Sequence, residues 1–202
     1  MKRILPLLLI SPLPVSAATR VELAGDRGIP AIAFSATEIE RAAAMALVGP
    51  PFVVSLEVDP AAGLDPQAYR IERPGADRVR VVGGGAPGAM YGGLDVAEAL
   101  RLGTTASLKP GLRSPHIAQR GIKFNIPLDL RTPSYTDCSD AAQANIPEMW
   151  QREFWTAFLD AMARHRYNVL SLWSLHPFPS LVKVPEFPEV ALDDVWRTRA
   201  KL

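Results

Sequence analysis

Five polar residues in the second half of the chain have side chains suited to binding a ligand rich in hydroxyl groups. They are Lys123, Asn125, Asp129, Arg131 and His176. Ammonium and guanidinium groups donate hydrogen bonds, a carboxylate accepts them, and amide and imidazole groups can do both. Carbohydrates are one class of ligand that would suit such a substrate-binding set. A sugar that carries a carboxylate, such as a uronic acid, would suit Lys123, Arg131 and His176 together.

Each of these residues also has a structural interpretation that the sequence leaves open. Asn125 and Asp129 have the side chains that form and cap turns. Arg131 can pair with a nearby acid, Asp129 or Asp137. His176 lies in a proline-rich loop, where backbone hydrogen bonds could hold it. An inward-facing lysine at the first strand would contact either substrate or a buried acid.

The elements around these residues explain why they should gather. Gly121–Ile126 reads as a strand, Pro147–His165 as a helix and Tyr167–Trp173 as an apolar strand. This order predicts a βαβ unit with two parallel strands. In α/β barrels the functional residues follow the carboxyl ends of the strands, where Trp173 could also offer an aromatic face to a sugar ring. The aromatic residues of the helix recur at helical spacing, which predicts core packing.

Upstream, short strands and two helices alternate. We expect a strand at Pro30–Phe34, a helix from Ser35 that stops at Gly49, a strand at Phe52–Val58, an antiparallel pair at Tyr69–Glu72 and Val79–Val82, and a helix at Ala86–Leu102. Ser35 and Glu38 have the spacing of a capping box. In the second helix, Pro87 suits the first turn and Gly103 the C-terminal cap. Its expected buried stripe comprises Met90, Leu94, Val96, Ala97, Leu100 and Leu102. Thr104–Pro115 looks like a linker.

Composition and charge narrow the class of protein. Of 202 residues, 48% are hydrophobic and 21% charged, and the net charge is +1. This balance predicts a globular protein and argues against a nucleic-acid or membrane-surface partner recognised by charge. Lys2 and Arg3, a short apolar run and the small residues Val15-Ser16-Ala17 follow the order of a secretory signal peptide. We therefore expect a periplasmic or extracellular protein, without membrane association once the signal is removed.

Cysteine and histidine usage points away from redox, nucleophilic and metal chemistry. Cys138 is the sole cysteine and has acidic neighbours, which would make it a poor thiolate. The three histidines, His116, His165 and His176, are scattered without the spacing of metal ligands. We expect no metal.

The glycine motif Gly83-x-Gly85-x-x-Gly88 formally matches a dinucleotide-binding fingerprint. The expected context is missing, because the following helix leads into a Pro-Gly segment instead of a strand that ends in an acid. We therefore interpret the motif as a tight turn that feeds the helix, and expect no cofactor.

Two segments resemble known glycoside hydrolases. Tyr69–Leu100 resembles the N-terminal domain ahead of the barrel in bacterial β-hexosaminidases and α-glucuronidases, where Gly88-Ala89-Met90-Tyr91-Gly92 matches the start of a recurring helix. Arg120-Gly121-Ile122-Lys123 resembles the opening of their first barrel strand. The resemblance covers about residues 30–173. It implies glycoside hydrolysis by acidic residues, or by a substrate amide plus an acid. No residue here matches the Asp-Glu pair that follows the fourth barrel strand in hexosaminidases.

These observations predict a signal peptide at residues 1–17, an α+β accessory domain at 20–112 and the first βαβ part of a truncated (β/α)8 barrel at 116–202. A complete barrel takes about 250 residues. The expected function is the N-terminal part of an exported glycoside hydrolase that acts on polysaccharide or oligosaccharide. It would be inactive alone, and would need the remaining barrel segment as its partner. A non-catalytic carbohydrate-binding protein and an inactive gene fragment are the alternatives.

Overall fold

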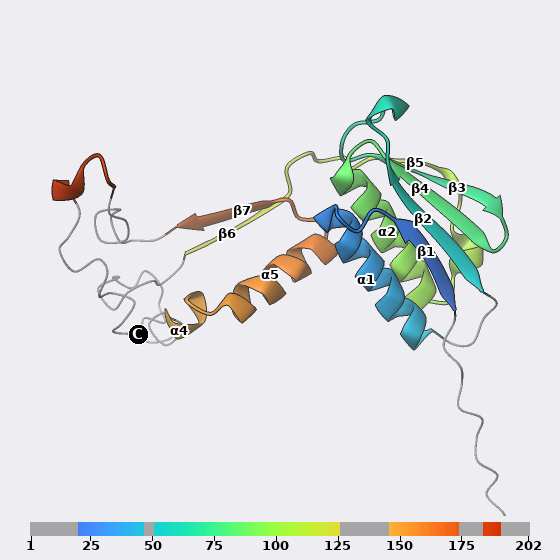
Figure 1. Ribbon diagram of the computed structural model, residues 1–202, viewed down its shortest axis with the longest axis horizontal. Coiled ribbons are helices and arrows are strands. Elements are labelled where there is room, and N and C mark those ends of the chain that lie inside the picture. Colours follow the sequence, from blue (N-terminus) through green and yellow to red (C-terminus); the bar gives the residue numbers. More distant parts are fainter. Residues whose placement is uncertain (1–19, 47–50, 126–145, 174–183, 191–202) are drawn as a thin grey trace, which may run out of the picture. The chain divides into compact units, whose positions relative to one another are not determined.

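The computed structural model describes residues 20–46, 51–125, 146–173 and 184–190 (Figure 1). The chain forms two compact units, Met1–His116 and Ile117–Leu202, and each is described by itself. The predicted signal peptide and Cys138 lie outside the described residues.

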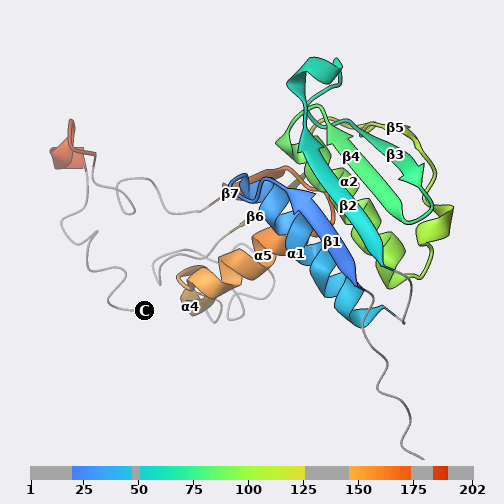
Figure 2. The same ribbon diagram turned by 45° about the vertical axis from the view of Figure 1, so that its right-hand side comes forward.

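The first unit is a mixed sheet of five strands with two helices. The strands are β1 (Val21–Gly25), β2 (Phe52–Val58), β3 (Tyr69–Gly75), β4 (Arg78–Gly83) and β5 (Gly111–Arg113). Their order across the sheet is β1-β2-β4-β3-β5. Strands β1, β2 and β4 run parallel, whereas β3 is antiparallel to both of its neighbours. Helices α1 (Pro30–Met45) and α2 (Ala86–Arg101) lie side by side on one face of the sheet (Figures 1 and 2). Two short 3-10 helices, η1 (Pro60–Ala62) and η2 (Thr105–Ser107), complete the unit.

The alternation along β2 shows how the sequence makes one face of the sheet the core. Phe52, Val54 and Leu56 are buried, and belong to the hydrophobic core that the helices cover. Ser55 and Glu57 alternate with them on the other face and are only partly buried. The predicted strand at Phe52–Val58 and the predicted antiparallel pair are both confirmed.

The opposite face of the sheet carries a small ion-pair network. Arg80 donates to Glu57 Oε1 at 2.8 Å, to Glu57 Oε2 at 2.6 Å and to Glu72 Oε2 at 2.9 Å. The Arg80 hydrogen bond is the main cause that lowers the pKa of Glu57. These groups are well exposed to solvent, so the network marks a solvated face and adds little to stability.

Helix α2 packs unusually close to the sheet because of its glycines. A Cβ atom added at Gly92 would lie 2.3 Å from Val81 Cγ1 and 2.7 Å from Tyr69 Cδ2. One added at Gly93 would lie 2.8 Å from Ser35 Cβ on helix α1. Gly92, the last residue of the motif that resembles the hydrolase domain, and Gly93 after it are therefore required by packing. A larger residue would push α2 off the sheet at Gly92 or off α1 at Gly93.

The start of the chain differs from the prediction. Pro30–Phe34 is the first part of helix α1, not a strand, and the strand before it is β1. Ser35 is not the N-cap but a fully buried mid-helix residue whose hydroxyl donates to the Ile32 carbonyl at 3.2 Å. Glu38, buried in the same helix, pairs with Arg41 at 2.5 Å. A short apolar run does not distinguish a strand from a helix, and Pro30 fits the first helical turn.

Helix α2 and the segment after it follow the prediction in part. Pro87 lies in the first turn, and Gly103 has φ of 63°, the left-handed conformation of a C-terminal cap. The prediction that Leu102 is buried is wrong, because this residue is 67% exposed. The prediction that Thr104–Pro115 is a linker is also wrong in part. The segment contains the 3-10 helix η2 and the strand β5, and β5 pairs with β3.

The second unit contains the predicted parallel strand pair. Its described elements are β6 (Gly121–Asn125), α4 (Ile146–Met149), α5 (Arg152–Arg164), β7 (Val169–Trp173) and η4 (Pro188–Val190). Strands β6 and β7 pair in parallel over their full length, which confirms that prediction. The single predicted helix is divided into α4 and α5, and the indole of Trp155 donates to the Met149 carbonyl at 2.9 Å across the break.

Apolar residues of the second unit stay open to solvent. Leu172 on β7 is 41% exposed and Val169 is 38% exposed. On α5 the side chains of Phe154, Trp155 and Phe158 contact one another. Parallel sheets are normally covered on both faces.

Candidate functional site

The parallel pair carries two of the predicted site residues on β6, with Asn125 at the carboxyl end of the strand and Lys123 in its middle. In the register, Lys123 is paired with Ser171 and Asn125 with Trp173. The side chain of Lys123 is exposed. The carboxyl edge is where α/β barrels place their functional residues. Asp129, Arg131 and His176 lie outside the described residues, so carbohydrate binding by this set stays a prediction.

The amino ends of the same strands are held by a dense set of hydrogen bonds. The Asn168 side chain accepts from the Arg120 backbone N–H and donates to the Ala118 carbonyl, both at 2.8 Å. Arg120 Nε donates to the Arg166 carbonyl at 2.8 Å. Residues at this end of barrel strands serve stability rather than catalysis. The arginine of the Arg-Gly opening therefore fixes the start of β6 against β7.

The glycine motif does not form an open cradle for phosphate. The Gly84 N–H donates to the Ala68 carbonyl at 3.0 Å, and the Gly88 N–H donates to the Pro66 carbonyl at 3.1 Å. A Cβ atom at Gly84 would lie 2.4 Å from the Asp65 carbonyl oxygen, and one at Gly88 2.2 Å from that of Ala68. The amide groups that would bind a pyrophosphate therefore bind the chain's own backbone, which explains the glycines without a cofactor.

A partly buried polar cluster, which the sequence did not indicate, joins α2 to strands β3 and β5. The Tyr69 hydroxyl donates to Asp95 Oδ2 at 2.5 Å, and Arg113 forms an ion pair with the same oxygen. Burial, and then the Asp95 carboxylate, raise the pKa of the Tyr69 hydroxyl. The available signals are weak: Asp95 interrupts the apolar face of α2, and Arg113 lies within a segment that looks like a linker.

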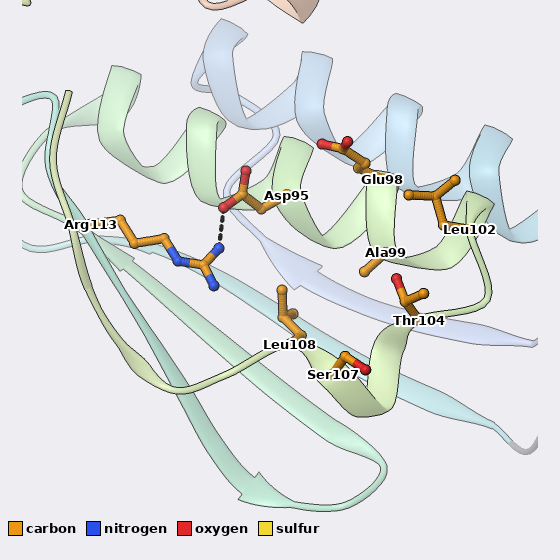
Figure 3. A pocket seen from close by; sticks show the side chains of 8 residues that line it. All are labelled: Asp95, Glu98, Ala99, Leu102, Thr104, Ser107, Leu108 and Arg113. Carbon is orange, nitrogen blue, oxygen red and sulfur yellow. Dashed lines mark hydrogen bonds and ion pairs between the residues drawn. The ribbon is translucent and has the colours of Figure 1, made fainter. Parts of the chain in front are cut away.

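Beside this cluster is a hollow of about 290 Å³, which we call the α2 pocket (Figure 3). Its lining combines acidic, hydroxyl, basic and aliphatic side chains. They are Asp95, Glu98, Ala99, Leu102, Thr104, Ser107, Leu108 and Arg113. Figure 3 shows the Asp95–Arg113 ion pair at one end of the pocket and Leu102 with Thr104 at the other. Ser107, the last residue of η2, and Leu108 after it complete the lining.

A second hollow, of about 530 Å³, lies at the carboxyl ends of β1 and β2. Its acidic side chains have local roles. Asp26 accepts from the Gly28 N–H at 2.8 Å, and Glu57 is held by Arg80. These contacts account for both carboxylates through the turn and the ion-pair network, so the α2 pocket is the stronger candidate.

Two further observations concern only the residues that the structure describes. Among them, no three His, Cys, Asp or Glu side chains gather in a group that could hold a metal ion. Within the same ranges, none of the helices is both long and apolar enough to cross a membrane.

In comparison with solved structures, the fold of this chain is similar to parts of two glycoside hydrolases. A GH138 enzyme targeting pectin rhamnogalacturonan II matches 91% of this chain with a TM-score of 0.64 and 22% identity. A GH115 4-O-methyl-α-glucuronidase with specificity for decorated arabinogalactans matches 78% of this chain with a TM-score of 0.52 and 17% identity. No protein-family model and no curated protein matches the sequence.

This likeness concerns the fold, because both identities are low. The chain spans only 22% and 25% of the two solved chains. The relation to glycoside hydrolases agrees with the sequence resemblance at that level. The finer assignment to hexosaminidases or glucuronidases, and the division into an accessory domain and a truncated barrel, stay predictions.

Proposed function

We propose that this chain forms an accessory domain and the first βαβ part of the catalytic barrel of an exported glycoside hydrolase that acts on polysaccharide or oligosaccharide. The observation that carries the proposal is the structural match of 91% of this chain to 22% of a GH138 enzyme. The parallel pair β6–β7 supports it, since barrel strands are parallel and the Arg120–Asn168 contacts lie at the end that serves stability.

The chain alone is proposed to lack hydrolytic activity. Glycoside hydrolysis typically needs two carboxyl groups on either side of the scissile bond. The resemblance matches no residue to such a pair, so no catalytic acid is assigned here. The exposed apolar side chains of β7 point to the same conclusion, because a working barrel would have to bury them.

The proposed substrate of the complete protein carries a uronic acid. One of the matching enzymes is a 4-O-methyl-α-glucuronidase. In this chain, Lys123 lies in the middle of β6, two residue pairs before the carboxyl end, and Arg131 and His176 follow the two strands in sequence. Three cationic or hydrogen-bonding side chains there would attract a sugar carboxylate.

A non-catalytic carbohydrate-binding protein is the second candidate. The α2 pocket favours it, because this pocket lies in the first unit and requires no barrel. Such a protein would bind glycans without cleaving them.

The test compares this chain with the product of its complete reading frame. Both are assayed for sugar release from rhamnogalacturonan II and from decorated arabinogalactans. We expect release by the complete product alone. If the complete product binds these glycans but releases no sugar, the binding protein is the better account, and if it neither binds nor cleaves them, both candidates fail.

In the complete product, Lys123→Ala tests the substrate proposal. We expect a tenfold or larger rise in KM for uronic substrates and little change for neutral ones, because only the former carry a carboxylate. An equal effect on both kinds of substrate would contradict the role of Lys123 in charge recognition.

A further inference from the structure

We propose that the α2 pocket binds one neutral sugar unit of a glycan, as a non-catalytic subsite in the first unit. The ligand class rests on the proposed function, whereas the site rests on the pocket itself. Its volume of about 290 Å³ is near the lower limit of small-molecule pockets, about 300 Å³. That size suits a single sugar ring better than a longer ligand.

The polar side of the pocket is organised in advance. Asp95 is fixed by the Tyr69 hydroxyl and by Arg113, so its position is set before any ligand arrives. Glu98 lies one turn further along α2, and the hydroxyls of Thr104 and Ser107 lie across the pocket from the helix (Figure 3). Carboxylates accept from sugar hydroxyls, and serine and threonine hydroxyls both donate and accept.

The apolar side of the pocket suits the C–H face of a sugar ring. Leu102 lines the pocket and is 67% exposed, although the helix periodicity predicts it to be buried. Leu108, which is a buried residue of the core, also lines the pocket. An aliphatic surface next to fixed carboxyl groups matches a ligand whose edge is polar and whose face is apolar.

The charge of the lining selects a neutral sugar over a uronic acid. The charged residues that line the pocket are two carboxylates, Asp95 and Glu98, and one guanidinium, Arg113. A ligand carboxylate would meet a net negative lining, and like charges at close range repel. This preference is opposite to the one proposed for the barrel residues, so the two sites can be distinguished by ligand.

The test measures binding of methyl glucoside, methyl galactoside and glucuronate to this chain by saturation-transfer NMR. Two variants remove pocket contacts at exposed positions, Leu102→Ser and Glu98→Ala. Leu112→Ser is the matched control, since Leu112 is also an exposed leucine, on β5, and does not line the pocket.

We expect saturable binding of at least one neutral glycoside, weakened about fivefold or more by each pocket variant, the effect of losing roughly one such contact. The control should bind as the unchanged chain does, and glucuronate should bind more weakly. Absence of saturable neutral-sugar binding, equal loss in the control, or tighter glucuronate binding would overturn the proposal. Hydrolysis by the complete product alongside no binding here would leave the proposed function standing and remove only this subsite.

Discussion

Replacing Gly92 by alanine should destabilise the first unit, because α2 packs too close to the sheet for a methyl group. The added Cβ would lie 2.3 Å from Val81 Cγ1 and 2.7 Å from Tyr69 Cδ2, well inside the ~3.5–4.0 Å of normal carbon contacts. Val81 is fully buried, and Asp95 holds the Tyr69 ring through its hydroxyl. Overpacking costs up to about 3 kcal/mol. Alanine's better helix propensity returns about 1 kcal/mol, which leaves a net loss of roughly 2 kcal/mol.

The assay must follow the first unit separately. All the tryptophans, Trp150, Trp155, Trp173 and Trp196, lie in the second unit, so tryptophan fluorescence reports on that unit. Hydrogen exchange of the α2 amides reports on the first. A loss of ~2 kcal/mol corresponds to roughly 30-fold faster exchange of the slowest amides, those that exchange by global unfolding.

Gly103 provides the control for this experiment. Its added Cβ would meet nothing within 4 Å, but its φ is 63°. Gly103→Ala should therefore cost only the left-handed strain of about 1–2 kcal/mol, and Gly103→Asn less, since asparagine tolerates that conformation. Unchanged exchange in Gly92→Ala would refute the packing argument, as would a loss no larger than that of Gly103→Asn.

Two further predictions concern the polar contacts. Asn168→Ala should destabilise the β6–β7 pair by about 0.5–1.5 kcal/mol, the net contribution of a hydrogen bond that water can partly replace. Faster hydrogen exchange of the Arg120 amide would show the loss, and unchanged exchange would contradict the proposed contacts. The stability of the first unit should fall as pH rises above about 10, where an unfolded tyrosine begins to ionise. The folded state raises the pKa of the Tyr69 hydroxyl, so at such pH the unfolded chain loses this proton more readily than the folded one, and unfolding is favoured. Urea titrations should show this fall to be smaller in Tyr69→Phe, and an equal fall in both proteins would refute it.

Elements with strong local signals could be predicted from the sequence. Helix α2 has proline in its first turn and glycine at its end, and each of these residues lies where its backbone preference places it. The parallel β6–β7 pair follows from the order strand, helix, strand, because a connection of that length brings the second strand back beside the first in parallel.

Elements set by tertiary contacts could not be predicted. Pro30–Phe34 reads equally well as a strand or as a helix, and the packing of Ile32 and Ser35 against neighbouring elements decides for the helix. Strand β5 is too short to have a signal of its own, and it forms because β3 offers it an edge.

The candidate site shows the same division. Asn125 could be placed near the carboxyl end of β6, and Lys123 earlier on the same strand, from alternation and strand order alone. The Tyr69–Asp95–Arg113 cluster joins residues far apart in sequence, and nothing local to any of them predicts the other two. The α2 pocket depends on this long-range contact and on η2, so it became visible only in the folded chain.

The backbone amide groups of the glycine motif are already hydrogen-bonded to carbonyl groups of the same chain. The stretch that includes Pro66 and Ala68 is joined to the motif by a short run of residues, so its carbonyl groups are present at an effective concentration on the order of millimolar or above. A soluble dinucleotide would have to outcompete this tethered occupant and break both amide hydrogen bonds. A glycine-rich fingerprint thus specifies a backbone shape. Whether its amide groups bind a ligand or the chain itself depends on which hydrogen-bond acceptor is held closest to them.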